Sequence, residues 1–499
     1  MAVRRHTTDL GTEPLGPLII RLSIPGMVSF LAMTLYNVVN TFWVSRLGAD
    51  AIAALTVVFP FQMVNVALGA GTGVGISSLS SRLFGQGKVE GANRVAGQVY
   101  SLSLLLGLLT LCTGVFFTGP VLGFFNALPQ FWHLSHRYLF IISFGTPFIY
   151  FMMMANNLLR GSGDTVTPMY IAVASAVLNA ALDPFLIFGW GPFPQLGVAG
   201  AALGTVITQA LGGAAYFLYL AGRRSSYTIR LPHLLPGLGV IGEIYRVGGP
   251  AMVMQLTSSL VIVIFNHFLG AFGAVAIAAY GLLFRISGVF LMPIIGMSQG
   301  LMPVVGYNFG ARNFRRMWEA VRLASIYATV VTGTSELMLL ALAVPLVSVF
   351  APTPQLLAVT TYAMRVYALA LLLVGAQFMW ITTLQALRRG GEAMVLSLLR
   401  QLVLIVPLMA LFSHFWGLSG IWAAQPVSDV LAFAITAAWM WAVRCRLRSP
   451  QHLCADAPVG GWGFPASRTS PARPDSSSGE HLKSCKTPCQ RLRDHGKME

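Results

Sequence analysis

An amide and a carboxyl group stand inside the otherwise apolar stretch LNAALDPFLIFG, residues 178–189. Asn179 and Asp183 are four residues apart, so on a helix their side chains share one face. An aspartate at the centre of a membrane helix costs roughly 2.5–3.5 kcal/mol, and such residues usually mark ion or proton paths. Pro184 lacks an N–H and frees the carbonyl of Ala180, which can coordinate a cation. The pattern predicts an ion or proton site at Asp183; the alternative is a structural carboxylate hydrogen-bonded to a neighbouring helix.

A second polar stripe lies in TLYNVVNTF, residues 34–42. Tyr36, Asn37, Asn40 and Thr41 recur there at spacings of three and four residues, as on one side of a helix. Such groups can coordinate an ion or line a cleft, although Asn and Thr also join membrane helices as ordinary packing contacts. Asn40 is a candidate for ion coupling, and Tyr36 and Asn37 are candidates for substrate contact.

Other polar residues lie deep in apolar runs and are candidates for a substrate cleft. Arg285, in YGLLFRISGVF, lies too deep for its side chain to reach the headgroups easily, so we expect it to face a cleft or an internal acid. Gln255 and Gln377 are candidate hydrogen-bonding residues for a substrate. A further set can equally consist of satisfied contacts between helices: Glu336, His267 and Asp429.

The composition indicates which elements must hold these residues. The chain has 499 residues, of which 56% are hydrophobic and only 10% charged, whereas a soluble domain carries about 25% charged residues. A helix needs about 20 apolar residues to cross a membrane. Runs of that size occur about twelve times, near residues 17–43, 51–80, 94–120, 135–159, 168–190, 197–221, 247–270, 274–304, 320–350, 358–386, 394–415 and 418–443. We therefore predict an all-α polytopic membrane protein with about twelve transmembrane helices.

The net charge of +16 follows the connections between these runs. Basic residues gather in both termini and in alternate connections, at 4–5, 82–94, 160, 223–246, 312–316, 388–389 and 444–448. Short cytoplasmic loops retain Lys and Arg, so both termini are expected to be cytoplasmic, as an even number of spans also requires. The basic charge thus reflects topology, and we expect no nucleic-acid partner.

The two halves of the chain resemble each other. A shift of 225 positions aligns Pro25 with Pro250 and GADAIAA (48–54) with GAVAIAA (273–279). The aligned positions include two pairs of glycines, Gly71 with Gly296 and Gly75 with Gly300. Each half holds six runs, so both enter the membrane in the same sense, as parallel repeats do. This predicts two six-helix lobes related by pseudo-two-fold symmetry around a central cleft, which suits alternating access.

The expected organisation has five parts. They are a cytoplasmic N-terminus (1–14), an N-terminal lobe (15–221), a cytoplasmic linker (222–246), a C-terminal lobe (247–445) and a cytoplasmic tail (446–499). The tail is rich in Pro, Ser and charge and cannot bury enough apolar surface to fold alone, so we expect it to be disordered.

Several segments, in order, resemble the multidrug and toxic compound extrusion (MATE) family. They are PGMVSFLAMTLYNVVNTFWVSRLGADAIAAL, LLRGSGDTVTPM, LNAALDPFLIFG with GVAGAALGTVI, and GMSQGLMPVVGYNFGARN. The resemblance covers about residues 15–445, with a break between the lobes. It implies two bundles of six helices in the inner cell membrane. It also implies export of organic, often cationic, compounds, driven by inward flow of protons or sodium ions.

Within that family, the chain is similar to the branch whose ion site lies in the N-terminal lobe. The resemblance implies a site made by a span-1 aspartate, a span-5 Asn and Asp four residues apart, and a span-6 Thr. The last three correspond to Asn179, Asp183 and Thr205, whereas the first corresponds to Asn40 and departs from the family pattern. The other branch uses acidic residues in spans 7 and 10, which have no counterpart here.

We therefore expect a secondary active multidrug efflux transporter that works by antiport against protons or sodium ions. The coupling ion should be its only cofactor, with no metal site beyond sodium at Asp183, and drugs and membrane lipid its partners. We expect a monomer. We do not expect an enzyme, because the sequence has no HExxH signature, and we do not expect direct drive by ATP, because it has no phosphate loop. The alternative is a flippase for lipids or lipid-linked oligosaccharides, which should need more than one deep cation besides Arg285.

Overall fold

The computed structural model describes residues 10–124, 129–191, 194–222, 225–350 and 353–448. These residues are largely helical, and they contain no strand. The predicted disordered tail from 449 onward and residues 1–9 lie outside them. The chain divides into two units after Thr436, so the end of the last helix belongs to the second unit and is described only as helix.

The N-terminal lobe contains six spans, one of them bent. They are α2 (Leu15–Ser45), α3 (Ala49–Gly85), α4 (Val89–Phe116), the pair α6 (Pro129–Ser143) and α7 (Thr146–Gly161), α8 (Val166–Phe188) and α9 (Val198–Ala221). A short helix, α5 (Thr118–Phe124), follows α4. The bend between α6 and α7 is 52°, at a point where the sequence pattern predicted one straight run.

The C-terminal lobe follows a connection that contains the short 3₁₀ helix η2 (Leu231–Leu234). Its elements are α10 (Leu238–Gly270), α11 (Ala274–Gly310), α12 (Phe314–Ala341), α13 (Ala343–Ser348), the pair α14 (Pro354–Ala368) and α15 (Leu371–Ala386), α16 (Gly390–Leu398), the π-helix η3 (Leu399–Leu404) and α17 (Ile405–Arg448). α14 and α15 meet at a 54° bend. α10 begins at Leu238, so the connection is shorter than the predicted linker.

The described helices confirm the predicted number of spans. Nine are long and apolar enough to cross a membrane, and the two bent pairs raise the number to eleven. The last of the nine runs from residue 390 to residue 447, but Gly417 has a non-helical backbone (φ 57°, ψ −134°) in the middle of it. That break divides it into two span-length halves, which gives twelve.

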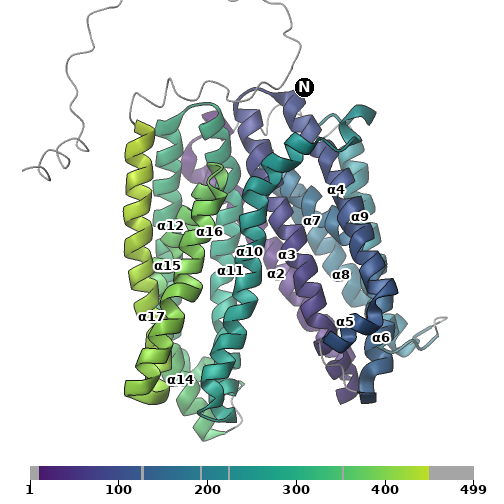
Figure 1. Cartoon of the computed structure of the whole chain (residues 1–499), viewed down its shortest axis with the longest axis vertical. Coiled ribbons are helices and arrows are strands. Elements are labelled where there is room, and N and C mark those ends of the chain that lie inside the picture. Colours follow the sequence, from purple (N-terminus) through teal and green to yellow (C-terminus); the bar gives the residue numbers. More distant parts are fainter. Residues whose placement is uncertain (1–9, 125–128, 192–193, 223–224, 351–352, 449–499) are drawn as a thin grey trace, which may run out of the picture. The chain divides into compact units, whose positions relative to one another are not determined.

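The lobes pack against each other symmetrically, α2 against α11 and α3 against α10 (Figure 1). Glycines bring these backbones together: a Cβ on Gly26 would lie 2.9 Å from the Gly296 carbonyl oxygen, and one on Gly75 would overlap the carbonyl of Ile244. Lipid tails are as apolar as Leu, so helices in membranes associate through such close packing of small residues rather than through the hydrophobic effect. We call these contacts the interlobe seam.

The seam lies at the basic end of the lobes. There Tyr227 of the linker hydrogen-bonds Ser80 (2.6 Å) and the carbonyl of Leu158 (2.7 Å), and Asn308 donates to the carbonyl of Leu10 (3.1 Å). Arg388 pairs with Glu243 at the same end. The connections that the sequence marks as cytoplasmic are thus adjacent in space, as their common charge predicts.

Away from the basic end, the facing surfaces of the lobes are exposed. On α11, Arg285 lies seven residues before Met292 and eleven before Gly296, so all three share one face. Met292 contacts Thr34 of α2 (3.8 Å) and Gly296 contacts Gly26, yet Arg285 is exposed. On each of the other three seam helices, the residue eleven positions from the seam contact is also exposed. These residues are Asn37 (from Gly26), Val64 (from Gly75) and Gln255 (from Ile244). We call these exposed faces of the four helices, at Asn37, Val64, Gln255 and Arg285, the interlobe cleft.

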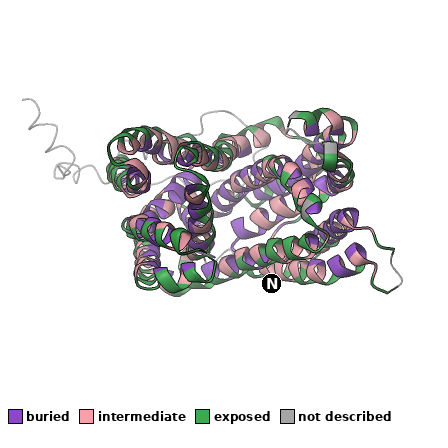
Figure 2. Cartoon of the chain, turned by 90° about the horizontal axis from the view of Figure 1, so that it is seen from below, coloured by how far each residue is buried: buried purple, intermediate pink, exposed green. Residues whose placement is uncertain are grey.

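Within the lobes, buried residues lie mainly on the helix faces that turn toward neighbouring helices (Figure 2). Among the described residues of the N-terminal lobe, two apolar clusters stand out. One, around Ile76, Leu158 and Tyr216, lies toward the basic end, and the other, around Phe61 and Ile187, lies farther along the helices. The polar residues predicted to bind ions fall between these clusters.

The seam gives the first testable expectation. Gly75→Val should prevent close approach of α3 and α10, because its Cβ would overlap the Ile244 carbonyl. We expect destabilisation by about 1–3 kcal/mol, as for other overpacked sites, measured as a lower melting temperature in detergent. The matched control is Gly249→Val, since a Cβ at Gly249 has no neighbour within 4 Å. Equal melting temperatures for the two variants would contradict the role of the seam.

Candidate functional site

Asp183 and Asn179 lie completely buried on α8, each with 0% of its surface exposed. None of their side-chain oxygen or nitrogen atoms has a hydrogen-bond partner of good geometry among the described residues. Buried polar groups are almost always satisfied, so an orphaned amide next to an orphaned carboxyl group requires an explanation. A bound ion, a water molecule or a proton would supply the missing partner.

α9 makes room for this pair. Gly204 faces α8, and a Cβ on it would lie 2.8 Å from Asp183 Oδ1 and 3.8 Å from Asn179 Nδ2. The next residue, Thr205, is also buried, and its hydroxyl lies 3.1 Å from the hydroxyl of Tyr36 on α2. The fold thus brings α2, α8 and α9 together around one small polar region.

The polar stripe of α2 divides between two faces. Tyr36 and Asn40 are one turn apart on the side that meets α8 and α9, and the buried Oδ1 of Asn40 has no partner among the described residues. Asn37 lies on the exposed cleft side, and its Nδ2 donates to the carbonyl of Met33 at 2.9 Å. Asn40 thus lies one turn from Tyr36, which meets Thr205, whereas Asn37 lies on the exposed side of α2.

Two further residues belong to this region that the sequence pattern did not single out. Tyr138 of α6 is buried, and Gln62 of α3 donates to its hydroxyl at 3.3 Å. Tyr138 and Tyr36 are both close enough to Asp183 to interact with its charge. Gly145 and Pro147 mark the break between α6 and α7 in the sequence, but they do not encode its 52° angle, on which the position of Tyr138 relative to α8 depends.

This arrangement offers oxygen atoms around a carboxylate in a region sealed from water. Carboxylate, amide and hydroxyl oxygens suit a hard cation such as sodium, and the carboxylate alone suits a proton. In low dielectric the charged carboxylate is disfavoured, so either ion would neutralise an energetically costly group. The described residues hold no group of three or more His, Cys, Asp or Glu side chains that could bind a metal.

The remaining candidates lie in the cleft or inside the C-terminal lobe. Arg285 and Gln255 are exposed on the cleft faces of α11 and α10, and Arg285 forms no ion pair with a described residue. Gln377 is fully buried instead, and its Nε2 lies 3.3 Å from the hydroxyl of Thr436. It is therefore enclosed within the lobe and does not face the cleft.

The C-terminal lobe contains a buried ion pair between Arg400 and Asp429. Arg400 Nε donates to Asp429 Oδ1 at 2.8 Å, with 13% and 4% of the two side chains exposed. Gln425 donates to both oxygens of Asp429 at 3.2 Å, and Ser428 donates to the carbonyl of Arg400 at 2.9 Å. Arg400 lies on η3, a π-helix, whose widened turn leaves carbonyls available for such bonds. Asp429 is thus a satisfied contact between helices.

The other intramembrane polar residues are also placed. Glu336 accepts a hydrogen bond from the backbone N–H of Leu372 at 2.9 Å and so satisfies a donor at the start of α15. His267 is exposed near the end of α10. Neither residue lies at the ion-site candidate.

Comparison with known proteins agrees with this architecture. A family model described as MatE matches residues 25–185 and 250–411. The chain belongs to the MATE family. The two matched segments begin 225 residues apart, which confirms the internal repeat.

Related MATE proteins cover nearly the whole membrane region. A protein named FAD transporter from Shewanella oneidensis is 30% identical over 86% of this chain and 94% of its own length. The multidrug export protein MepA from Staphylococcus haemolyticus is 29% identical over 83% and 91%. A solved structure titled as the outward-facing conformation of a multidrug resistance MATE transporter superposes with a TM-score of 0.84 at 28% identity, covering 89% of this chain and 99% of that one. The family and these relatives are transporters, and this chain is a multi-pass cell-membrane protein.

Gly204→Ala should weaken ion binding, because the new methyl group would press on Asp183 Oδ1. We expect about tenfold lower affinity, as when a supporting residue of an ion site is lost, measured from the melting temperature as a function of sodium concentration and pH. Gly213→Ala on the same helix is the control, because its Cβ would meet Phe148 at an ordinary 3.8 Å. An unchanged ion response in Gly204→Ala would count against the site.

Breaking the C-terminal ion pair should destabilise the protein without removing the ion response. Arg400→Gln or Asp429→Asn leaves a buried charge uncompensated, which costs about 3–5 kcal/mol, whereas the double variant should recover much of that loss. Glu392→Gln removes the more exposed pair with Arg389 and should cost less than about 1 kcal/mol. Melting temperatures of the four variants test this; additive losses in the double variant would exclude a coupled pair.

Proposed function

We propose that this protein is a secondary active efflux transporter that exports organic compounds by antiport against protons or sodium ions. The observation that carries the proposal is the buried Asp183, which has no cationic partner among the described residues and lies against Gly204, close to Thr205 and Tyr36. Intramembrane carboxylates of this kind mark coupling sites in transporters. The names of the relatives, a multidrug export protein and a FAD transporter, support organic compounds as cargo.

α2 links the ion site to the movement of the lobes. Tyr36 reaches Thr205 beside the ion-site candidate, and about three to four turns earlier Gly26 and Ser23 form the seam with α11. An ion that neutralises Asp183 changes the contacts of α2 with α8 and α9, and the same rigid helix transmits that change to the seam. Any ion that prefers one arrangement of the lobes must shift their equilibrium toward it.

The transport cycle then follows from the two arrangements. With the seam closed and the cleft exposed at the other end, an ion from outside reaches Asp183 and organic cargo leaves outward. Release of the ion on the cytoplasmic side accompanies opening of the seam and binding of new cargo. Asn37, Gln255 and Arg285 face the cleft and are the proposed cargo contacts. Both lobes come from one chain, so a monomer suffices for this cycle.

The flippase alternative has less support. A lipid phosphate crossing the cleft would need several cations along its path. In the apolar lengths of the four seam helices away from the basic end, residues 27–45, 49–81, 247–270 and 274–310, Arg285 is the only Arg or Lys. Small organic compounds fit such a surface better.

Replacement of Asp183 tests the proposal. Asp183→Asn keeps the shape of the side chain but cannot change charge, so ion-driven efflux should fall to the level of protein-free vesicles. The measurement is efflux of ethidium, and separately of a flavin, from reconstituted vesicles under a pH gradient alone and then a sodium gradient alone. Asp50→Asn, at an exposed carboxylate beyond the site, is the control and should transport normally. Efflux by Asp183→Asn at the wild-type rate would refute the proposal.

A further inference from the structure

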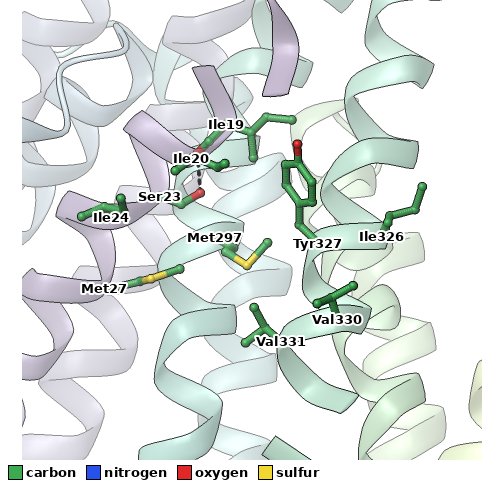
Figure 3. A pocket seen from close by; sticks show the side chains of 10 residues that line it. All are labelled: Ile19, Ile20, Ser23, Ile24, Met27, Met297, Ile326, Tyr327, Val330 and Val331. Carbon is green, nitrogen blue, oxygen red and sulfur yellow. Dashed lines mark hydrogen bonds between the residues drawn. The ribbon is translucent and has the colours of Figure 1, made fainter. Parts of the chain in front are cut away.

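A groove of about 420 Å³ opens on the outer surface beside the interlobe seam (Figure 3). One wall is α2, with Ile20, Ile24 and Met27, and the other is formed by Met297 of α11 with Ile326 and Val330 of α12. The lining is apolar apart from two hydroxyl groups. That of Ser23 donates to the carbonyl of Ile19 at 2.6 Å within α2, and that of Tyr327 lies beside Gly16.

The groove is open toward the surrounding lipid. Ile20, Ile24, Ile326 and Val330 are between 46% and 61% exposed. Its volume falls in the range of ligand pockets, about 300–1,000 Å³. Unlike an ordinary lipid-facing surface, it has walls from both lobes, so its width depends on how the lobes are arranged.

Arginines mark the end of the groove nearest the basic surface. Arg322 lies one helical turn before Ile326 on α12, is exposed, and forms no hydrogen bond or ion pair with a described residue. Arg21 lies next to Ile20 on α2, half-exposed, and pairs with Glu13 at 2.7 Å. At this end of the groove, the charged residues at the start of α2 and in the first turns of α12 are Glu13, Arg21, Arg315, Arg316, Glu319 and Arg322. Basic groups therefore outnumber acidic groups by two.

We propose that this groove binds an anionic phospholipid of the leaflet at the basic end. One acyl chain lies between α2 and α12 against Met27 and Met297, and the phosphate contacts Arg322, with Arg21 beside it. An acyl chain matches the apolar, elongated lining. The excess of arginine at one end matches a phosphate rather than a neutral or cationic headgroup.

Such a lipid would favour one arrangement of the lobes. Its chain touches both walls only while the seam is closed, because opening the seam separates α2 from α11 and α12. The bound lipid therefore stabilises the closed seam, and by reciprocity seam closure strengthens lipid binding. Only this effect on transport rests on the alternating access proposed above; the binding itself does not.

Lipid binding can be measured directly on the full chain. Titration with phosphatidylglycerol and with phosphatidylcholine, followed by native mass spectrometry, should show preferential retention of phosphatidylglycerol. Arg322→Gln should bind it about fivefold more weakly, as expected for one arginine at a lipid surface. Ile326→Trp fills the groove and should abolish the preference. Lys88→Gln is the control, because it removes one exposed charge at the same end away from the groove.

Three results would overturn the lipid site: equal retention of the two lipids by the wild type, unchanged binding by both Arg322→Gln and Ile326→Trp, or displacement by Ile326→Trp of a hydrophobic drug but not of phosphatidylglycerol.

Efflux from vesicles of each lipid tests the effect on transport. The wild-type rate should differ at least about fivefold between them, and that of Ile326→Trp should not. Equal wild-type rates would overturn the coupling. Asp183→Asn should still bind phosphatidylglycerol, so a failure of the proposed function remains distinguishable from a failure of the lipid site.

Discussion

Close backbone contact between the two lobes is the constraint on which the rest of the structure depends. In a membrane, apolar side chains gain little by leaving lipid for a protein interface, so helices must associate through dense packing. The lobes achieve this with glycines on facing helices, Gly26 against Gly296 and Gly75 against Ile244. Because these contacts occupy only the basic end, the lobes are joined there and their facing surfaces are exposed beyond it. A joint of this kind can open without disturbing the interior of either lobe.

The second constraint is the cost of Asp183. A carboxylate that has no cationic partner among the described residues, between two apolar clusters, is tolerable only if something else compensates for its charge. The surrounding helices contribute space at Gly204 and hydroxyls at Thr205 and Tyr36, and none of them supplies a fixed cation. Since α2 belongs both to this region and to the seam, the energy of the charged group is connected to the geometry of the joint. That connection is what ion-driven transport requires.

The two lobes share a fold but not a chemistry. In the N-terminal lobe the buried acid is unpartnered, whereas in the C-terminal lobe Asp429 is neutralised by Arg400 and held by Gln425. A neutralised pair has no need of a mobile ion and stabilises its own helices instead. The repeat therefore preserves helix order and glycine contacts, while the polar residues inside each bundle have diverged. Under the proposed function, this asymmetry places ion coupling in the N-terminal lobe and leaves the C-terminal lobe as a wall of the cleft.

The sequence alone determined the membrane location, twelve spans, the two-lobe repeat and the common face of Asn179 and Asp183. These follow from local rules: hydropathy over about 20 residues, charge in the connections, and helical spacing. Only the tertiary structure decided that Tyr138, held by Gln62, approaches Asp183, that Gln377 is enclosed, and that Asp429 has an arginine partner. These contacts join residues far apart in the chain across bends in α6–α7 and at the π-helix η3, and no local pattern encodes the angle of a bend. Local spacing along the sequence predicts which residues share a helix face, but the packing of the helices decides which residues of other helices they contact.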